Sequence, residues 1–136
     1  MGKRSREEGR LTVLRFSREH LWVRVEADRG QIGISNYGQG LFGELIGIEL
    51  PEIGDRIERG EPFAQVESSR TLYELVAPLN GTVVSANTEL EQSPSLANED
   101  PHHEGWLIEV EIEDDGELDD LMGPEEYEEF VAEESD

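Results

Sequence analysis

The residues Gly38-Gln39-Gly40-Leu41-Phe42-Gly43 match the G-x-G-x-x-G pattern. In dinucleotide-binding proteins the glycines of this pattern let a pyrophosphate approach the N-terminus of a helix that follows directly. Here the next run, Glu44–Leu50, is typical of a strand, and the chain is too short and too rich in predicted strands for a doubly wound sheet. We therefore interpret residues 38–43 as a flexible glycine-rich connection and expect no nucleotide site.

Two histidines and a glutamate, His102-His103-Glu104, provide nitrogen and oxygen atoms of the kind that bind zinc. Adjacent side chains on an extended segment point in opposite directions, and the remaining histidine, His20, is far away in the sequence. The sequence therefore favours a surface loop over a metal site, and we expect no bound metal.

Pairs of acidic residues, Asp114-Asp115 and Asp119-Asp120, could act as an acid and a base in catalysis. No surrounding pattern predicts a pocket for them, so a solvated acidic face is the better interpretation. The chain has no cysteine, which excludes a thiol nucleophile, a disulfide and cysteine-based metal sites. We predict that this protein is not an enzyme.

The charge of the chain is divided unequally. The formal net charge is −22, and all 11 Lys and Arg residues lie in residues 1–70. Residues 71–136 therefore have no Lys or Arg with which to bind phosphate groups, which argues against nucleic acid and membranes as partners. The acidity favours solubility or salt tolerance, with a docking surface for a basic partner as the alternative. Because there is neither a long apolar run nor a signal-like N-terminus, we expect a cytoplasmic protein.

The elements that must position these residues are mostly short strands. Leu, Ile, Val and Phe make up about 26% of the chain, above the level of roughly 20% below which disorder is expected. Alternating apolar residues predict strands at 21–27, 31–35, 44–50, 62–68, 72–76, 82–86 and 106–112. Apolar residues at helical spacing predict two short helices, around 118–122 and 124–131.

A chain of this length builds one ordinary core, with Trp22 and Trp106 as predicted anchors. We expect a mobile leader at residues 1–10 and one mainly β domain over residues 11–136, a small sandwich or flattened barrel with an acidic, helical C-terminal end. The polar stretch Ser68-Ser69-Arg70-Thr71 separates two predicted strands and indicates a tight, exposed turn at Arg70.

Seven segments of the chain, taken in order, resemble the H-protein of the glycine cleavage system. They are Glu19–Arg24, Ile32–Tyr37, Glu49–Asp55, Val66–Ser68, Ala77–Val84, Asn98–Pro101 and Glu104–Leu107, and the resemblance extends from about Leu11 to Val131. It implies a lipoyl-domain-like fold, a barrel-sandwich hybrid of two small antiparallel sheets with short C-terminal helices. In this fold a hairpin turn presents one lysine.

The resemblance also implies what an H-protein does. In the family the lysine is amide-linked to lipoate, which takes an aminomethyl group from the pyridoxal-phosphate-dependent glycine decarboxylase. The lipoyl group passes this to the tetrahydrofolate-dependent aminomethyltransferase and is reoxidised by dihydrolipoamide dehydrogenase. An H-protein is thus a carrier without an active site of its own.

This chain departs from the family pattern at the attachment residue. The family's hairpin, Glu-Ser-Val-Lys followed by small residues and an acid, aligns without a gap with Glu67–Glu74 and places Arg70 at the lysine position. A guanidinium stays protonated and is a poor nucleophile, so we expect no lipoate on Arg70 and no other cofactor. The only lysine, Lys3, lies in the leader, and Thr71-Leu72-Tyr73 is bulkier than the family's small residues.

Other side chains near this turn could take part in recognition by a modifying or partner enzyme. They are Glu67, Ser68, Ser69, Thr71 and Glu74. Glu67 could instead be a solvated acid that pairs with Arg70 at the surface. Arg70 could bind an acidic or phosphate-bearing partner, or serve only as a soluble turn residue.

Three functions follow from this interpretation. The first is an unlipoylated docking or regulatory protein that works with glycine decarboxylase, aminomethyltransferase, dihydrolipoamide dehydrogenase or a lipoylated paralogue. The second is a non-catalytic interaction module outside glycine metabolism. The third, a working lipoyl carrier, is disfavoured by the missing lysine.

Overall fold

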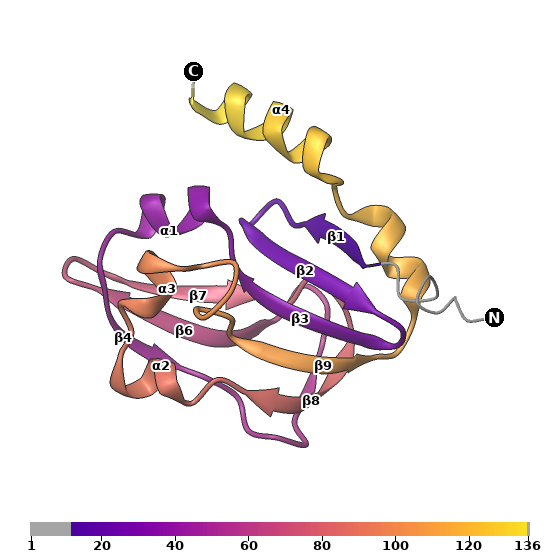
Figure 1. The fold of residues 1–136 in the computed structure, drawn as a ribbon, viewed down its shortest axis with the longest axis horizontal. Helices are drawn as coiled ribbons and strands as arrows, with labels where there is room; N and C mark the ends of the chain where they lie inside the picture. The colour runs from indigo at the N-terminus through magenta and orange to yellow at the C-terminus, as the bar shows by residue number, and fades with distance from the viewer. Residues whose placement is uncertain (1–11, 136) are drawn as a thin grey trace.

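Two antiparallel sheets form the body of the protein in the computed structural model, which describes residues 12–135 (Figure 1). The larger sheet has the strand order β1-β2-β3-β9-β8-β5 and the smaller has the order β4-β6-β7. The larger sheet comprises β1 (Val13–Phe16), β2 (Leu21–Glu26), β3 (Arg29–Ile34), β5 (Arg56–Ile57), β8 (Gly81–Ala86) and β9 (Ile108–Ile112). The smaller comprises β4 (Leu45–Glu49), β6 (Pro62–Ser68) and β7 (Leu72–Val76). The expected mainly β fold of two antiparallel sheets is confirmed.

The core lies between the two sheets. Alternate residues of each strand point inward, so Val23 and Ile32 of the larger sheet and Val66 of the smaller are completely buried. A second cluster around Trp22 packs the C-terminal helix against the other face of the larger sheet. Trp22 is a core anchor, as predicted, whereas Trp106 is only half-buried beside this second cluster.

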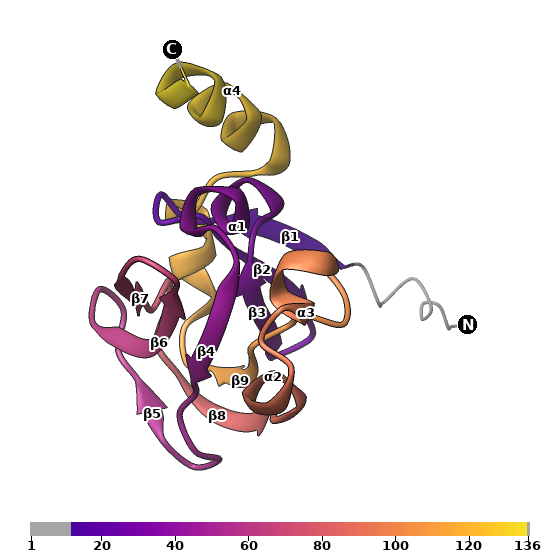
Figure 2. The same cartoon turned by 90° about the vertical axis from the view of Figure 1, so that its left-hand side faces the viewer.

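Short helices connect the strands, and a longer one ends the described part of the chain (Figure 2). They are α1 (Asn36–Phe42), α2 (Glu89–Gln92), α3 (Leu96–Glu99), the 3-10 helix η2 (Asp115–Asp120) and α4 (Pro124–Ser135). Helix α4 begins at a proline, whose fixed φ suits a first helical turn. Figures 1 and 2 show α4 at one end of the molecule, beyond β1. No helix in the described part of the chain is long and apolar enough to cross a membrane.

The glycine-rich segment is helical, so the interpretation of residues 38–43 as a flexible connection is wrong. Helix α1 begins after Ser35, whose Oγ accepts a hydrogen bond from the backbone N–H of Gly38 at 2.9 Å. A Cβ atom on Gly38 would lie 2.8 Å from the Cβ of His20, so only glycine allows this close approach. The helix cap and the close packing stabilise a helix that its glycines alone would disfavour.

The other predicted elements correspond closely to those observed. The strands predicted at 44–50 and 106–112 are β4 and β9, each trimmed at its ends. Strands β1 and β5 were not predicted; β5 has only 2 residues. Helix α4 confirms the second predicted helix, whereas the first is the 3-10 helix η2, which ends at Asp120 before Leu121 and Met122. The predicted leader lies outside the described residues.

Candidate functional site

The turn between β6 and β7 lies at the left margin of Figure 1. The two strands pair antiparallel with Glu67 opposite Leu72, which leaves residues 68–71 to form a tight turn. Ser69, Arg70 and Thr71 are exposed. The prediction of a tight, exposed turn at Arg70 is therefore confirmed.

Ser68 organises this turn. Its backbone N–H donates to the carbonyl oxygen of Thr71 at 2.9 Å. Its Oγ accepts hydrogen bonds from the N–H groups of Arg70 and Thr71 at 3.3 and 3.4 Å. Ser68 is only 6% exposed. It therefore shapes the turn from inside and offers little surface to another protein.

The guanidinium of Arg70 extends from the turn without an ion-pair partner among residues 12–135. The surface pairing of Arg70 with Glu67 is accordingly not observed. The side chain of Glu67 lies instead over Gly47 of β4, where an added Cβ would come within 3.3 Å of Glu67 Oε1. Glu74 stands opposite Gln65 in the sheet, away from the turn. Of the predicted recognition residues, Glu67 and Glu74 thus belong to the sheet face and the others to the tip.

A hollow of about 290 Å³ adjoins the tip. One side is formed by the end of α1 and the residues after it, 40–44, and the other by Ser68–Arg70 and Tyr73. The rings of Phe42 and Tyr73 pack against each other with centroids 4.6 Å apart. Helix α1 therefore supports the hairpin, a contribution that the sequence did not predict because its glycine-rich pattern indicated no helix there.

Asn98 fixes the end of α1 next to the hairpin. Its Nδ2 donates to the carbonyl oxygen of Gly43 and to Gln39 Oε1, both at 2.9 Å, and its Oδ1 accepts from the N–H of Leu45 at 2.9 Å. One amide side chain thus joins α3, α1 and β4. This role depends on residues distant in the sequence, so the sequence pattern alone did not indicate it.

His102 fixes the other end of α1. Its Nε2 accepts a hydrogen bond from the N–H of Asn36 at 3.1 Å, and its ring packs at 5.7 Å from that of Trp22. Burial lowers the pKa of His102, and the nearby guanidinium of Arg24 lowers it further. The segment 102–104 is a loop, as expected, but His102 is half-buried and structural. Among the described residues no group of three or more His, Cys, Asp or Glu side chains could hold a metal ion.

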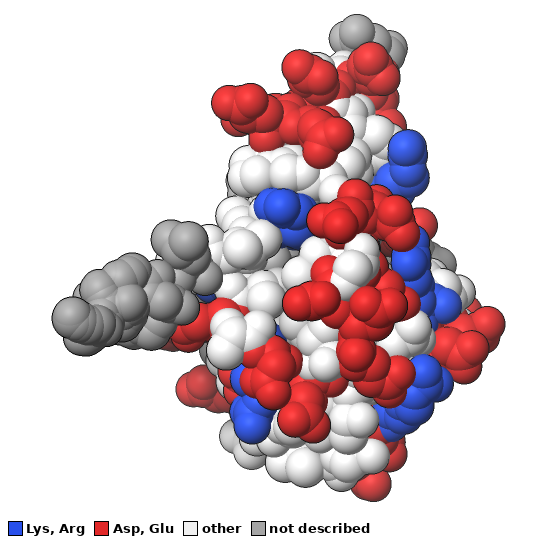
Figure 3. Space-filling model, turned by 90° about the vertical axis from the view of Figure 1, so that its right-hand side faces the viewer, with Lys and Arg blue, Asp and Glu red and all other residues white. Residues whose placement is uncertain are grey.

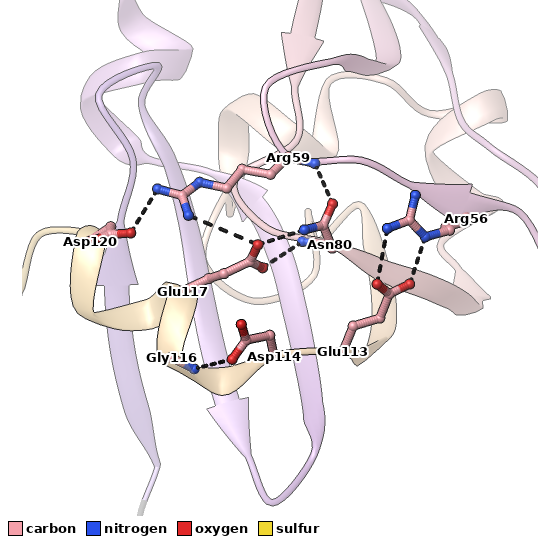
Figure 4. A network of polar contacts seen from close by, with 8 residues as sticks. All are labelled: Arg56, Arg59, Asn80, Glu113, Asp114, Gly116, Glu117 and Asp120. Atoms are coloured by element: carbon pink, nitrogen blue, oxygen red, sulfur yellow. Dashed lines mark hydrogen bonds and ion pairs between the residues drawn. The ribbon is translucent and has the colours of Figure 1, made fainter.

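The acidic residues near η2 form a structural network on another part of the molecule (Figure 4). Arg56 binds Glu113 through two hydrogen bonds of 2.7 and 3.0 Å, and this contact lowers the pKa of the Glu113 carboxyl. Arg59 binds Asp120 at 3.0 Å, and Asp114 Oδ1 accepts from the N–H of Gly116 as the helix cap. Asp114, Asp115, Asp119 and Asp120 are all exposed, so the interpretation of an acidic, solvated face is confirmed. Asp114 and Asp120 also have structural contacts on this face.

The side chains of the turn do not fit a covalently attached lipoyl group. An amide bond to lipoate needs an amine that can lose a proton and attack an activated acyl group. The turn offers the hydroxyls of Ser69 and Thr71 and the guanidinium of Arg70, which stays protonated. No lysine occurs in residues 12–135, and Lys3 lies outside them.

Two antiparallel sheets around one core, with an exposed hairpin turn at one end, define a barrel-sandwich protein of the lipoyl-domain-like class. The family model described as "Glycine cleavage H-protein" matches residues 14–134. The chain therefore belongs to the glycine cleavage H-protein family.

Individual relatives agree with this assignment. The glycine cleavage system H protein of Bacillus subtilis is 47% identical over 120 residues, which cover 88% of this chain and 94% of the relative. That of Brevibacillus brevis is 48% identical over 120 residues, with 88% and 95% covered. The crystal structure of a glycine cleavage system H protein from Mycobacterium marinum matches with a TM-score of 0.76 and 25% identity, covering 90% of this chain and 96% of that one.

Membership in this family has two consequences. H-proteins are carriers and not enzymes, which agrees with the prediction that this chain is not an enzyme. The family works with the enzymes of glycine cleavage, and its members normally carry lipoate. The side chains of the turn in this chain must be compared with the lysine that carries lipoate in other members of the family.

Proposed function

We propose that this chain is an unlipoylated H-protein that acts as a docking or regulatory partner of glycine cleavage enzymes rather than as an aminomethyl carrier. The observation that carries the proposal is Arg70 in the turn at which the family attaches lipoate to lysine. A protonated, delocalised guanidinium is a poor nucleophile toward an acyl group. The chain therefore needs no cofactor for this role.

The shape of the tip supports a docking role. Ser68 holds the turn, and the contact between Phe42 and Tyr73 supports it from α1. A protein that keeps the H-protein shape without a lipoyl arm can occupy the H-protein site on glycine decarboxylase or aminomethyltransferase. It would thereby compete with a lipoylated paralogue in the cytoplasm or support its assembly with these enzymes and dihydrolipoamide dehydrogenase.

A second candidate function is an interaction module outside glycine metabolism. The observation that favours it is Leu72, which is 55% exposed beside the tip where the family has a small residue. An exposed leucine at this place changes the surface that a glycine cleavage enzyme would meet. Binding measurements separate the two candidates.

The test is to titrate this chain into glycine decarboxylase that is working with its own lipoylated H-protein. We expect the apparent KM for the lipoylated H-protein to rise while kcat stays constant, because the two proteins share one site. Without the lipoylated protein, this chain should give no aminomethyl transfer. Transfer by this chain alone would overturn the proposal in favour of a carrier. Absence of binding to all three enzymes would favour the module outside glycine metabolism.

A further inference from the structure

The outer face of the small sheet carries apolar side chains that the described part of the chain leaves uncovered. Figure 2 shows β6 and β7 at the left margin of the molecule, with no helix outside them. Leu72 of β7 is 55% exposed, and Ile46, at the β4 edge of this face, is 56% exposed. Two of the exposed large apolar residues in residues 12–135 thus lie on one small sheet.

The strand register arranges this face in two rows. One row is Gly47, Glu67 and Leu72, and the next is Glu49, Gln65 and Glu74. The residues between these rows, Ile48 and Val66, are buried, so the rows point away from the core. We refer to the two rows together with Ile46 as the outer face.

Three carboxylates accompany the apolar side chains of the outer face. Glu49, Glu67 and Glu74 are exposed, and no residue of β4, β6 or β7 is a lysine or an arginine. Among residues 12–135 none of the three carboxylates has an ion-pair partner. Neighbouring like charges on a sheet repel each other, so a cation supplied by another molecule would relieve this repulsion.

The outer face is also hollowed at the end away from the turn. A hollow of about 300 Å³ lies between Glu49 and Glu74 and is lined in addition by Pro51, Phe63 and Gln65. Its lining combines the apolar side chains of Pro51 and Phe63 with the carboxylates of Glu49, Asp55 and Glu74. This mixture suits a long basic side chain, whose methylene groups pack on Phe63 while its charged end meets a carboxylate. This gives the face a place for an anchor residue.

We propose that the outer face is a docking surface for a partner protein whose contact surface carries Lys or Arg around apolar side chains. This inference rests on the proposed docking role and names the chemistry of the partner. Apolar centres with charge-complementary margins are typical of specific protein interfaces. Membranes with anionic lipids and nucleic acids are excluded as occupants because the three carboxylates would repel them.

Matched variants separate this face from the general acidity of the chain. Glu49→Gln with Glu74→Gln removes two charges from the margins of the hollow. Glu128→Gln with Glu129→Gln removes the same charge from exposed positions of α4. Leu72→Ala removes exposed apolar area, and because Leu72 is more than half exposed, the variant should stay folded.

The probe is a nine-residue peptide of alternating Arg and Leu, compared with a peptide of alternating Arg and Ser. Binding is followed by amide chemical shifts of the isotope-labelled chain. We expect the Arg-Leu peptide to shift residues of β4, β6 and β7 and to bind about tenfold more tightly than the Arg-Ser peptide. Leu72→Ala should remove most of this difference. Glu49→Gln with Glu74→Gln should weaken binding about fivefold and the α4 variant less than twofold.

Two results would overturn the inference. One is equal affinity for both peptides, and the other is a set of shifts centred on α4. The same variants distinguish this inference from the proposed function. If the chain binds a glycine cleavage enzyme and Glu49→Gln with Glu74→Gln binds it equally well, the docking role stands and the outer face is not the surface used. If the chain binds none of these enzymes, the docking role fails, and the peptide comparison still decides the inference.

Discussion

Arg70 decides what the hairpin turn can do chemically. Its guanidinium is exposed, unpaired within residues 12–135 and permanently charged, so it can bind a carboxylate or phosphate but cannot form the family's amide. The two bulky residues that follow have different roles. Leu72 is exposed, whereas Tyr73 packs on Phe42 and supports the turn. Replacing Leu72 with a smaller residue should therefore alter only the surface, whereas replacing Tyr73 with a smaller residue would also loosen the hairpin.

The lowered pKa of His102 makes the stability of the protein depend on pH. Its pKa in the folded protein lies below the usual 6.5, so between these two values the unfolded chain binds more protons than the folded one. The contribution of His102 to stability is therefore lost as pH falls through 6.5 toward the lower pKa. In the His102→Gln variant, the amide oxygen of the glutamine can accept the hydrogen bond from the Asn36 N–H, and it does not titrate. The free energy of unfolding of this variant should therefore fall less as the pH is lowered.

Urea unfolding at about pH 7.5 and about pH 5.5 measures this difference for both proteins. The comparison with His102→Gln is needed because the rest of the chain also contributes to the pH dependence of stability. It changes His102 alone. An equal loss of stability in the two proteins would show that His102 does not titrate differently on folding.

At the scale of elements, α4 and α1 are joined by a buried hydrogen-bonded chain. The hydroxyl of Tyr127 lies 2.8 Å from His20 Nδ1 and 2.6 Å from Ser35 Oγ, and Ser35 caps α1. His20 Nε2 lies 3.0 Å from a carboxylate oxygen of Glu134, further along α4. Burial raises the pKa of Tyr127, so its hydroxyl keeps its proton and can donate.

Tyr127→Phe should therefore destabilise the protein by about 1–2 kcal/mol, because it leaves a buried histidine nitrogen without its partner. Hydrogen exchange should also become faster in α4 and in the first turn of α1. Tyr73→Phe is the matched control, since the Tyr73 hydroxyl has no hydrogen bond within residues 12–135. If Tyr127→Phe lost no more stability than Tyr73→Phe, apolar packing alone would hold α4 in place.

The elements also show how far the sequence predicts this molecule. Strands such as 62–68 and 72–76 were predictable because alternation and flanking polar residues are local signals, and the turn at Arg70 followed from them. Helix α1 was not, because it depends on contacts of Gly38 with His20 and of Gly43 with Asn98. The hollow beside the tip was missed for the same reason, since α1 forms one side of it.

At the scale of the whole molecule, the unequal division of charge in the sequence is partly offset in space. Arg56 and Arg59, from the less acidic half, bind Glu113 and Asp120 of the other half. Figure 3 shows the side of the molecule that lies to the right in Figure 1, where acidic side chains cover much of the surface and basic side chains lie among them. With 33 acidic and 11 basic residues, the formal net charge of −22 still leaves a net repulsion between the acidic side chains.

We therefore expect salt to stabilise the protein. The Debye length falls from roughly 30 Å at 0.01 M to about 3 Å at 1 M salt, which screens repulsion between distant carboxylates more than contacts such as that of Arg56 with Glu113. A gain of about 1 kcal/mol would raise Tm by roughly 3–6 °C. Thermal unfolding at increasing sodium chloride concentration measures this rise in Tm. The control is a variant with glutamine in place of glutamate at residues 125, 126, 128 and 129. The Tm of this variant should rise less with salt than that of the wild-type chain. A fall of the wild-type Tm with salt would show that the ion pairs outweigh the repulsion.

The central claim, that this H-protein carries no lipoyl group because the turn lacks an amine, is tested by intact-mass spectrometry. The chain is produced together with a lipoate ligase and lipoate, beside Arg70→Lys, Arg70→Lys with Leu72→Ala, and Arg29→Lys as a control lysine in an exposed position of β3. We expect the wild type and Arg29→Lys to remain unmodified and Arg70→Lys to be modified in part. Leu72→Ala should increase that fraction, because a tip misplaced by about 1 Å can slow a reaction ~100-fold. A lipoyl group on the wild-type chain would contradict the account.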